Sequence, residues 1–176
     1  MAKELKIVEL GDKRLRAGTK NVAKIRDKKF QKFIDDLIHT CDIKNGVGIA
    51  APQVGSNHNL FIVWSRPNKR YPYAPTLGPI AIINPHIISK SKKMKKGWEG
   101  CLSIPGVRAL VSRHTSIEVE YETRDGGKVR ETHKDFVARI FQHEYDHLKG
   151  VVFLDIVNTK DIVTEAEFQK ILKKRK

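Results

Sequence analysis

Residues 135–150 read DFVARIFQHEYDHLKG, and this stretch decides the fold because it predicts one buried helix with a His-Glu-x-x-His motif. His143 and His147 stand four residues apart, so both imidazoles lie on one helix face, where they can reach one metal ion. Glu144 can then serve a water at that metal. The flanking apolar residues predict burial of the helix: Phe136, Val137, Ile140, Phe141 and Leu148. The alternative is an ordinary pair of surface histidines one turn apart.

A hydrolytic metal site usually has three protein ligands and one open position, so a third ligand must come from elsewhere. A metzincin would need a histidine six residues after His147, and Phe153 stands there. A thermolysin-like peptidase would use a glutamate from a later helix. Glu165 and Glu167 are available, but both lie in a polar segment beside a lysine-rich tail. The third source is Cys101.

Cys41 and Cys101 are the two cysteines, too few for a disulfide framework, which favours a reducing compartment. Cys41 falls on the apolar side of a helix expected over residues 28–41, as an ordinary buried cysteine does. Cys101 follows Gly100 and stands shortly before Pro105. We expect this loop-like setting to present a thiolate to a metal.

The run GVGIAAPQ, residues 46–53, is the third notable element. It lacks the Lys-Ser/Thr of a phosphate-binding loop and the spacing of a dinucleotide fold, so it is either a tight turn or part of a site. The three motifs, residues 46–53, residues 99–103 (EGCLS) and residues 142–148 (QHEYDHL), resemble in order and approximate spacing those of the peptide deformylases. The resemblance extends from about Ile7 to Asp155.

The resemblance implies a metal-dependent hydrolase that removes the formyl group from the N-terminal formyl-methionine of new proteins. It implies three metal ligands: Cys101, His143 and His147. It makes Glu144 the general base and acid, and it makes Gln53 and the backbone N–H of Leu102 the donors that stabilise the oxyanion. An HExxH-type metallopeptidase is the alternative, although it explains only the helix motif.

Substrate contacts are expected on two sides of the metal. Phe136, Ile140 and the two histidines share one helix face, so the apolar pair is a candidate pocket for the methionine side chain, with plain core packing as the alternative. The resemblance implies that the peptide lies as an added strand beside Val47, Gly48 and Gly100. Arg108 matches an arginine near the pocket of the family.

The ligand set does not identify the metal. Cysteine and histidine suit zinc, yet imidazole also suits iron, nickel and cobalt. The resemblance favours Fe²⁺, with Zn²⁺, Ni²⁺ or Co²⁺ as alternatives.

Length and hydropathy predict a small α+β enzyme. At 176 residues with 40% hydrophobic content, the chain can form one core, so we expect a single domain over residues 1–176, with antiparallel or mixed sheets around the metal-binding helix. Strands are expected over residues 60–64, 80–83, 117–123 and 128–133, the last two joined by a hairpin turn at residues 125–127. No signal peptide or membrane span is visible, which predicts a cytoplasmic protein without a membrane partner.

The formal net charge of +14 is concentrated in two places. One is a cluster expected in a single loop: Lys90, Lys92, Lys93, Lys95 and Lys96. The other is a basic helix at about residues 164–176, which starts with a capping-box pattern. Contact with RNA, and for an enzyme of nascent chains with the ribosome, is the functional interpretation. A solvated tail is the alternative, and no DNA partner is expected.

Overall fold

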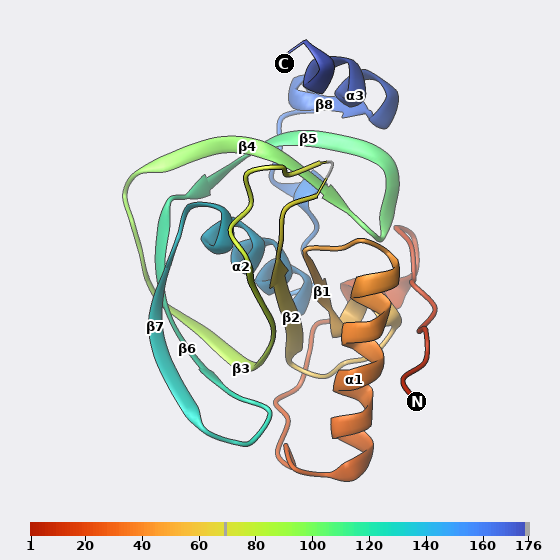
Figure 1. Ribbon diagram of the computed structural model, residues 1–176, viewed down its shortest axis with the longest axis vertical. Coiled ribbons are helices and arrows are strands. Elements are labelled where there is room, and N and C mark those ends of the chain that lie inside the picture. The colour runs from red at the N-terminus through yellow and green to blue at the C-terminus, as the bar shows by residue number, and fades with distance from the viewer. Residues whose placement is uncertain (69, 175–176) are drawn as a thin grey trace.

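The computed structural model describes residues 1–68 and 70–174, and in this part it confirms the expected α+β fold. Its helices are α1 (Lys28–Ile43), α2 (Asp135–Leu148) and α3 (Glu165–Lys173). Its strands are β1 (Gly48–Ala50), β2 (Leu60–Ser65), β3 (Leu77–Lys90), β4 (Met94–Cys101), β5 (Ile104–His114), β6 (Ser116–Glu122), β7 (Lys128–Lys134) and β8 (Ile162–Thr164). Two antiparallel sheets, in the orders β1-β2-β3-β6-β7 and β4-β5-β8, enclose α2 (Figure 1).

Strand β2 lies between the central helix α2 and the outer helix α1. Its side chains alternate between the two faces of the sheet, as in any strand. Phe61 points to α2 and meets Phe141 edge-on with the ring centroids 4.9 Å apart. Leu60 and Ile62 point the other way and pack with Ile34 of α1. Both faces are covered, in keeping with the continuous apolar run over residues 60–64, and the packing of β2 holds α2 in the middle of the molecule.

Helix α2 has the limits that its sequence predicts. Ala138 and Phe141 are fully buried against the sheet, and the histidines emerge on an adjacent face of the same helix. Helix α1 begins after Asp27, whose carboxylate accepts hydrogen bonds from the N–H groups of Lys29 and Phe30. It ends at Ile43, two residues beyond the expected limit.

The segment between β3 and β5 differs from the expectation. The five lysines are not in one loop, because Lys90 is the last residue of β3 while Lys95 and Lys96 belong to β4. Cys101 is also not in a loop. It ends β4 and pairs with Ile104 across a two-residue turn, so the backbone ladder fixes the position of its thiol.

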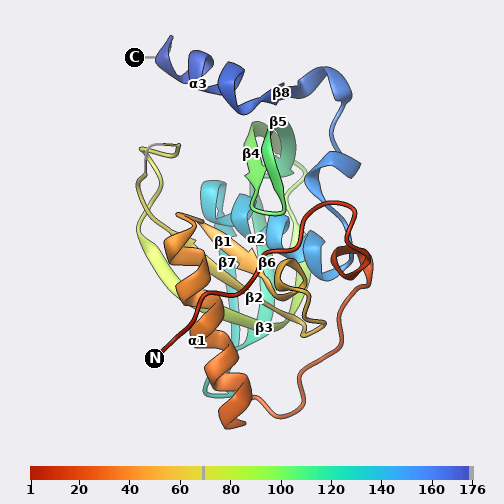
Figure 2. The same ribbon diagram turned by 90° about the vertical axis from the view of Figure 1, so that its right-hand side faces the viewer.

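The C-terminal part of the chain lies against the smaller sheet. Strand β8 pairs with β5, and α3 follows beside it at the edge of the molecule (Figures 1 and 2). The connection between β2 and β3 projects toward α3 in the same view (Figure 2). Helix α3 ends at Lys173, so the basic helix is shorter than expected, and residues 175–176 lie outside the described part of the chain. Within the described residues, none of the helices has the length and apolar character needed to cross a membrane.

Candidate active site

One sulfur and two imidazole rings meet at the inner end of a cleft. Strand β4 supplies Cys101 and helix α2 supplies His143 and His147, and their ligand atoms lie within 4.8 Å of one another. The Sγ atom of Cys101 is 3.2 Å from Nε2 of His147. One thiolate and two imidazoles fit a divalent cation such as zinc or iron, with a further position for water or substrate.

The electrostatics of the two rings also fit a cation. Burial and the neighbouring His143 hold the pKa of His147 well below its usual value, so this ring is in the neutral form that binds a metal. Burial lowers the pKa of His143, but hydrogen bonds with Cys101 and Glu99 outweigh it and raise that pKa well above the usual value. The surroundings of His143 therefore favour a positive charge at this point.

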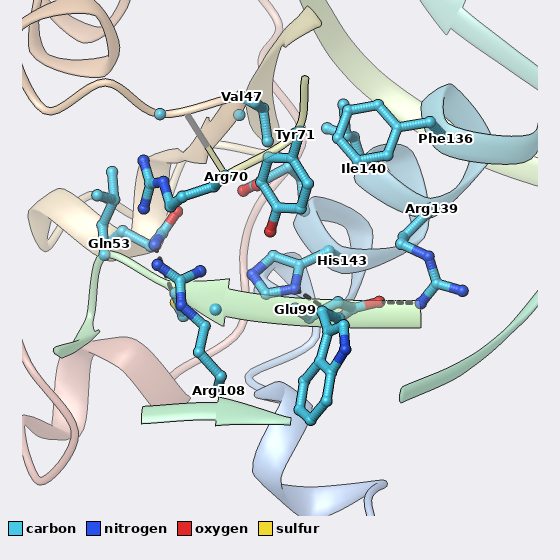
Figure 3. Close-up of a pocket in the computed structure, with 17 residues that line it drawn as sticks. Val47, Gln53, Arg70, Tyr71, Glu99, Arg108, Phe136, Arg139, Ile140 and His143 are labelled. Atoms are coloured by element: carbon cyan, nitrogen blue, oxygen red, sulfur yellow. Dashed lines mark hydrogen bonds and ion pairs between the residues drawn. The ribbon is translucent and has the colours of Figure 1, made fainter. Parts of the chain in front are cut away.

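Glu99 holds His143 from behind. Its Oε2 atom lies 2.9 Å from Nδ1 of His143, which leaves Nε2 of the ring for a metal (Figure 3). Arg113 makes two hydrogen bonds of 3.0 Å to the same carboxylate, and Arg139 makes one of 2.8 Å. Burial raises the pKa of Glu99, yet Arg113 and His143 outweigh it and the pKa is lowered. The carboxylate is thus charged and fixed.

Glu144 lies on the same helix, with its side chain against β1. It is 4% exposed, and burial raises its pKa to about 7. Its Oε2 atom has no hydrogen-bond partner within the described part of the chain. A Cβ atom on Gly48 would come within 2.6 Å of Oε1, so the glycine leaves the space that the carboxylate occupies. A carboxyl group that titrates near neutrality can both accept and donate a proton.

Gln53 faces the sulfur from the opposite side. The N–H of Ala50 donates to Oε1 of Gln53 at 2.8 Å, which turns the NH₂ group toward Sγ of Cys101 at 3.3 Å. Leu102 follows Cys101 in the turn between β4 and β5. The N-terminal arm ties the two motifs together, because the N–H of Val8 donates to the carbonyl of Gln53 and that of Leu10 to the carbonyl of Ser103.

The walls of the cleft come from three segments. Phe136 and Ile140 of α2 form one apolar side (Figure 3). Tyr71, from the connection between β2 and β3, packs on Phe136 with the ring centroids 4.9 Å apart. The remaining expected substrate residues also line the cleft: Val47, Gly48 and Gly100. All the sequence-predicted site residues therefore converge here, with His147 behind the lining, only 1% exposed.

Some residues of the site were not expected from the sequence. They are Arg70, Tyr71, Glu99, Arg113 and Arg139. Glu99 belongs to a recognised motif, but its arginine partners are distant in sequence and carry no local signal. The glutamates considered for a thermolysin-like site do not join the cluster, since Glu165 binds Arg108 and Glu167 binds Lys170.

Fold and site together define a metal-dependent hydrolase that acts on an amide bond. Residues 4–162 match the family model described as polypeptide deformylase, and the chain belongs to this family. Members are hydrolases that release the formyl group from formyl-methionyl peptides, and this is the activity of the chain. The comparisons give no support for a metallopeptidase.

Individual relatives agree over nearly the whole chain. Peptide deformylase 2 of Nostoc sp. is 53% identical over 171 residues, which cover 97% of this chain and 96% of the relative. A Met-Ala-Ser-bound crystal structure of the class I type b peptide deformylase from Acinetobacter baumannii has a TM-score of 0.87 at 38% identity and covers 89% of this chain and 100% of its own. The peptide deformylase of Synechococcus elongatus in complex with actinonin has a TM-score of 0.80 at 35% identity and covers 99% of this chain and 87% of its own.

Proposed function

We propose that Cys101, His143 and His147 hold the catalytic cation of this deformylase, and that Glu144 is its general base and acid. The observation that supports this best is the convergence of the three ligand atoms within 4.8 Å beside a buried carboxyl group with a pKa of about 7. When bound, the cation supplies the Lewis acidity that makes water a nucleophile at neutral pH.

The residues around the cation have separate tasks. Glu144 accepts the proton of the water that attacks the formyl carbon, and it returns this proton to the nitrogen of the departing amine. The NH₂ group of Gln53 and the backbone N–H of Leu102 donate to the oxygen that becomes negative during the attack, each contributing roughly 3–4 kcal/mol. The products are formate and a free α-amino group.

The substrate lies between two kinds of surface. Phe136 and Ile140 receive the methionine side chain, with Tyr71 closing the pocket from the opposite segment. The peptide backbone runs beside Val47, Gly48 and Gly100, where two glycines permit close approach. This arrangement is supported by the shared lining of the cleft, which joins the apolar patch to the ligand cluster.

Formate release from formyl-Met-Ala-Ser, with metal-quantified protein purified without oxygen, tests this proposal. Release by the wild type and its loss in Glu144→Ala at unchanged metal content are expected. Release that survives in Glu144→Ala would contradict the role of this residue. Cleavage of unformylated peptides in place of formate release would move the site to the peptidases.

We propose Fe²⁺ as the physiological metal, with Zn²⁺, Ni²⁺ or Co²⁺ as substitutes. A thiolate with two imidazoles accepts all four ions, so the choice depends on supply and geometry. Metal analysis of protein purified without oxygen should find about one iron per chain. Activity of the iron form should decay in air while that of the nickel form persists. Equal stability of both forms in air would argue against iron.

We further propose that α3 contacts ribosomal RNA through three exposed lysines: Lys170, Lys173 and Lys174. Deleting the helix would be a poor test, because Phe168 is 1% exposed and packs on Trp98 beside the cleft. Replacing the three lysines by glutamine keeps this packing. We expect weaker, less salt-dependent co-sedimentation with ribosomes. The control removes the same charge from another exposed surface: Lys24, Lys28 and Lys29 to glutamine.

The two cysteines support a cytoplasmic location. Both are free thiols, and Cys101 must remain a thiol to bind a metal. Fractionation of cells that produce the chain, with the metal content of each fraction measured, would test this location. Active enzyme in an oxidising compartment would contradict it.

A further inference from the structure

Helix α3 contacts Trp98 and Arg108, two residues that line the active-site cleft. Strand β8 pairs with β5 so that Val163 lies opposite Arg108, which puts Glu165 next to the arginine. The Nε atom of Arg108 donates to Oε2 of Glu165 at 2.5 Å. The ring centroids of Phe168 and Trp98 are 5.3 Å apart. Both Trp98 and Arg108 line the cleft.

The Arg108 side chain is held in one place by these contacts. It is only 8% exposed, and its guanidinium carbon lies 5.4 Å from the centre of the Phe168 ring. It extends across Gly100, because a Cβ atom at that position would collide with Nη1 of Arg108. The guanidinium therefore lies on the strand edge along which the peptide is proposed to run.

Arg108 has donors left for a peptide. Glu165 accepts a hydrogen bond from the Nε atom of Arg108 only. Within the described residues, neither Nη atom of Arg108 makes a hydrogen bond. The free N–H groups suit peptide carbonyls and carboxylates. Arg108 also enters the cleft on the side opposite Phe136 and Ile140, the proposed methionine pocket (Figure 3). Its donors can therefore reach backbone of the substrate while the side chain of methionine is bound elsewhere.

We infer that Glu165 is a positioning residue for substrate binding, which acts by holding Arg108 across Gly100 so that the guanidinium meets the peptide backbone. This inference rests on the proposed function, and it makes the C-terminal helix a part of the substrate site. It predicts an effect on substrate affinity, since within the described residues Arg108 makes no hydrogen bond to Cys101, His143 or His147, and the proposed proton-transfer group is Glu144.

The test compares Glu165→Gln with Glu167→Gln. Both substitutions remove one charge from the same helix, but Glu167 binds exposed Lys170 and does not contact Arg108. For formyl-Met-Ala-Ser we expect Glu165→Gln to raise KM about three- to ten-fold with kcat and melting temperature nearly unchanged. Glu167→Gln should match the wild type. In an Arg108→Gln background, Glu165→Gln should add no further increase in KM.

Three outcomes would overturn the inference. They are equal KM values for the two glutamine variants, a loss confined to kcat or melting temperature, and an undiminished effect of Glu165→Gln without Arg108. In each case an active wild type leaves the proposed function intact. A wild type that releases no formate although its metal is bound would instead refute the proposed roles themselves.

Discussion

The Nδ1 atom of His143 lies 2.9 Å from Oε2 of Glu99, a carboxylate that also receives hydrogen bonds from two largely buried arginines. A single contact thus connects a candidate metal ligand to an ion network between β4, β5 and α2. The network fixes the orientation of the ring and determines which nitrogen faces Cys101. The side of the site around His143 is therefore held by charged side chains, whereas the wall at Phe136 is apolar.

Glu99→Gln should weaken metal binding by about 10- to 100-fold, because the substituted amide orients His143 less strongly. The change also leaves Arg113 and Arg139 without their buried counter-charge, so the melting temperature should fall. Chelator competition on folded protein measures the affinity. Glu118→Gln is the control. It breaks an exposed ion pair with Arg130 and should retain the metal affinity of the wild type. Unchanged metal affinity in Glu99→Gln would refute the role of this contact.

Gly48→Ala should reduce kcat by at least about ten-fold, because the added methyl group displaces the carboxylate of Glu144 from the position proposed for the general base. Metal content should stay at the wild-type level, since the three proposed ligand residues are untouched. Gly127→Ala, in the distant turn between β6 and β7, controls for the added methyl group. A Gly48→Ala enzyme with full kcat would mean that Glu144 has more freedom than its packing indicates.

The two thiols should differ in reactivity. Burial raises the pKa of Cys41 to about 12, so at pH 8 almost none of it is thiolate, the form that reacts with iodoacetamide. Mass spectrometry of the folded protein should find Cys41 unmodified. Denatured protein should be alkylated at both Cys41 and Cys101. Rapid alkylation of Cys41 in the native state would indicate that α1 opens readily from β1.

Asp36 should make stability depend on pH. Burial raises its pKa, yet hydrogen bonds from the Lys3 N–H and the Lys32 ammonium group outweigh this, and the pKa is lowered from its usual 3.8. Because the folded pKa lies below the unfolded one, the carboxylate stabilises the fold above the unfolded value, and this contribution is lost as pH falls through the folded value. Asp36→Asn should lower the free energy of unfolding by about 1 kcal/mol at pH 7.

Urea unfolding at several pH values measures this effect. The difference between wild type and Asp36→Asn should shrink below about pH 4. Asp35→Asn is the control, since Asp35 is half exposed and pairs with Arg124 at the surface. A difference that persists undiminished at low pH would show that the asparagine acts through packing.

The elements with strong local patterns could be predicted from the sequence. Helix α2 has the expected limits because its apolar residues and its ending glycine agree in one segment. The sequence predicts a strand over residues 80–83, but β3 extends from Leu77 to Lys90 and contains Pro79 and Pro85, a residue type that is unfavourable inside a strand. The structure accommodates Pro85 at a shift of register between Ile83 and His86, next to Asn84 with a φ of 49°.

The residues of the site that belong to the three motifs could be predicted from the sequence. The motifs identify residues that the fold brings together, but not the partners that orient them. Arg113 follows Glu99 by 14 residues, near the end of β5, and Arg139 follows it by 40 residues, in the first half of α2. Their role depends on how β5 and α2 pack. The position of Tyr71 likewise depends on the path of the connection between β2 and β3, which cannot be predicted from the composition of that segment.

The ligand cluster connects the smaller sheet with the central helix α2. Cys101 belongs to the smaller sheet, whereas both histidines belong to α2, which is packed on the larger one. A cation held by the three proposed ligands would therefore act as a crosslink, and because only the folded chain presents all three, its binding free energy would add to the folding free energy. Thermal denaturation across a metal titration thus becomes a binding assay that needs no substrate, and it can rank metals even in an inactive Glu144→Ala protein.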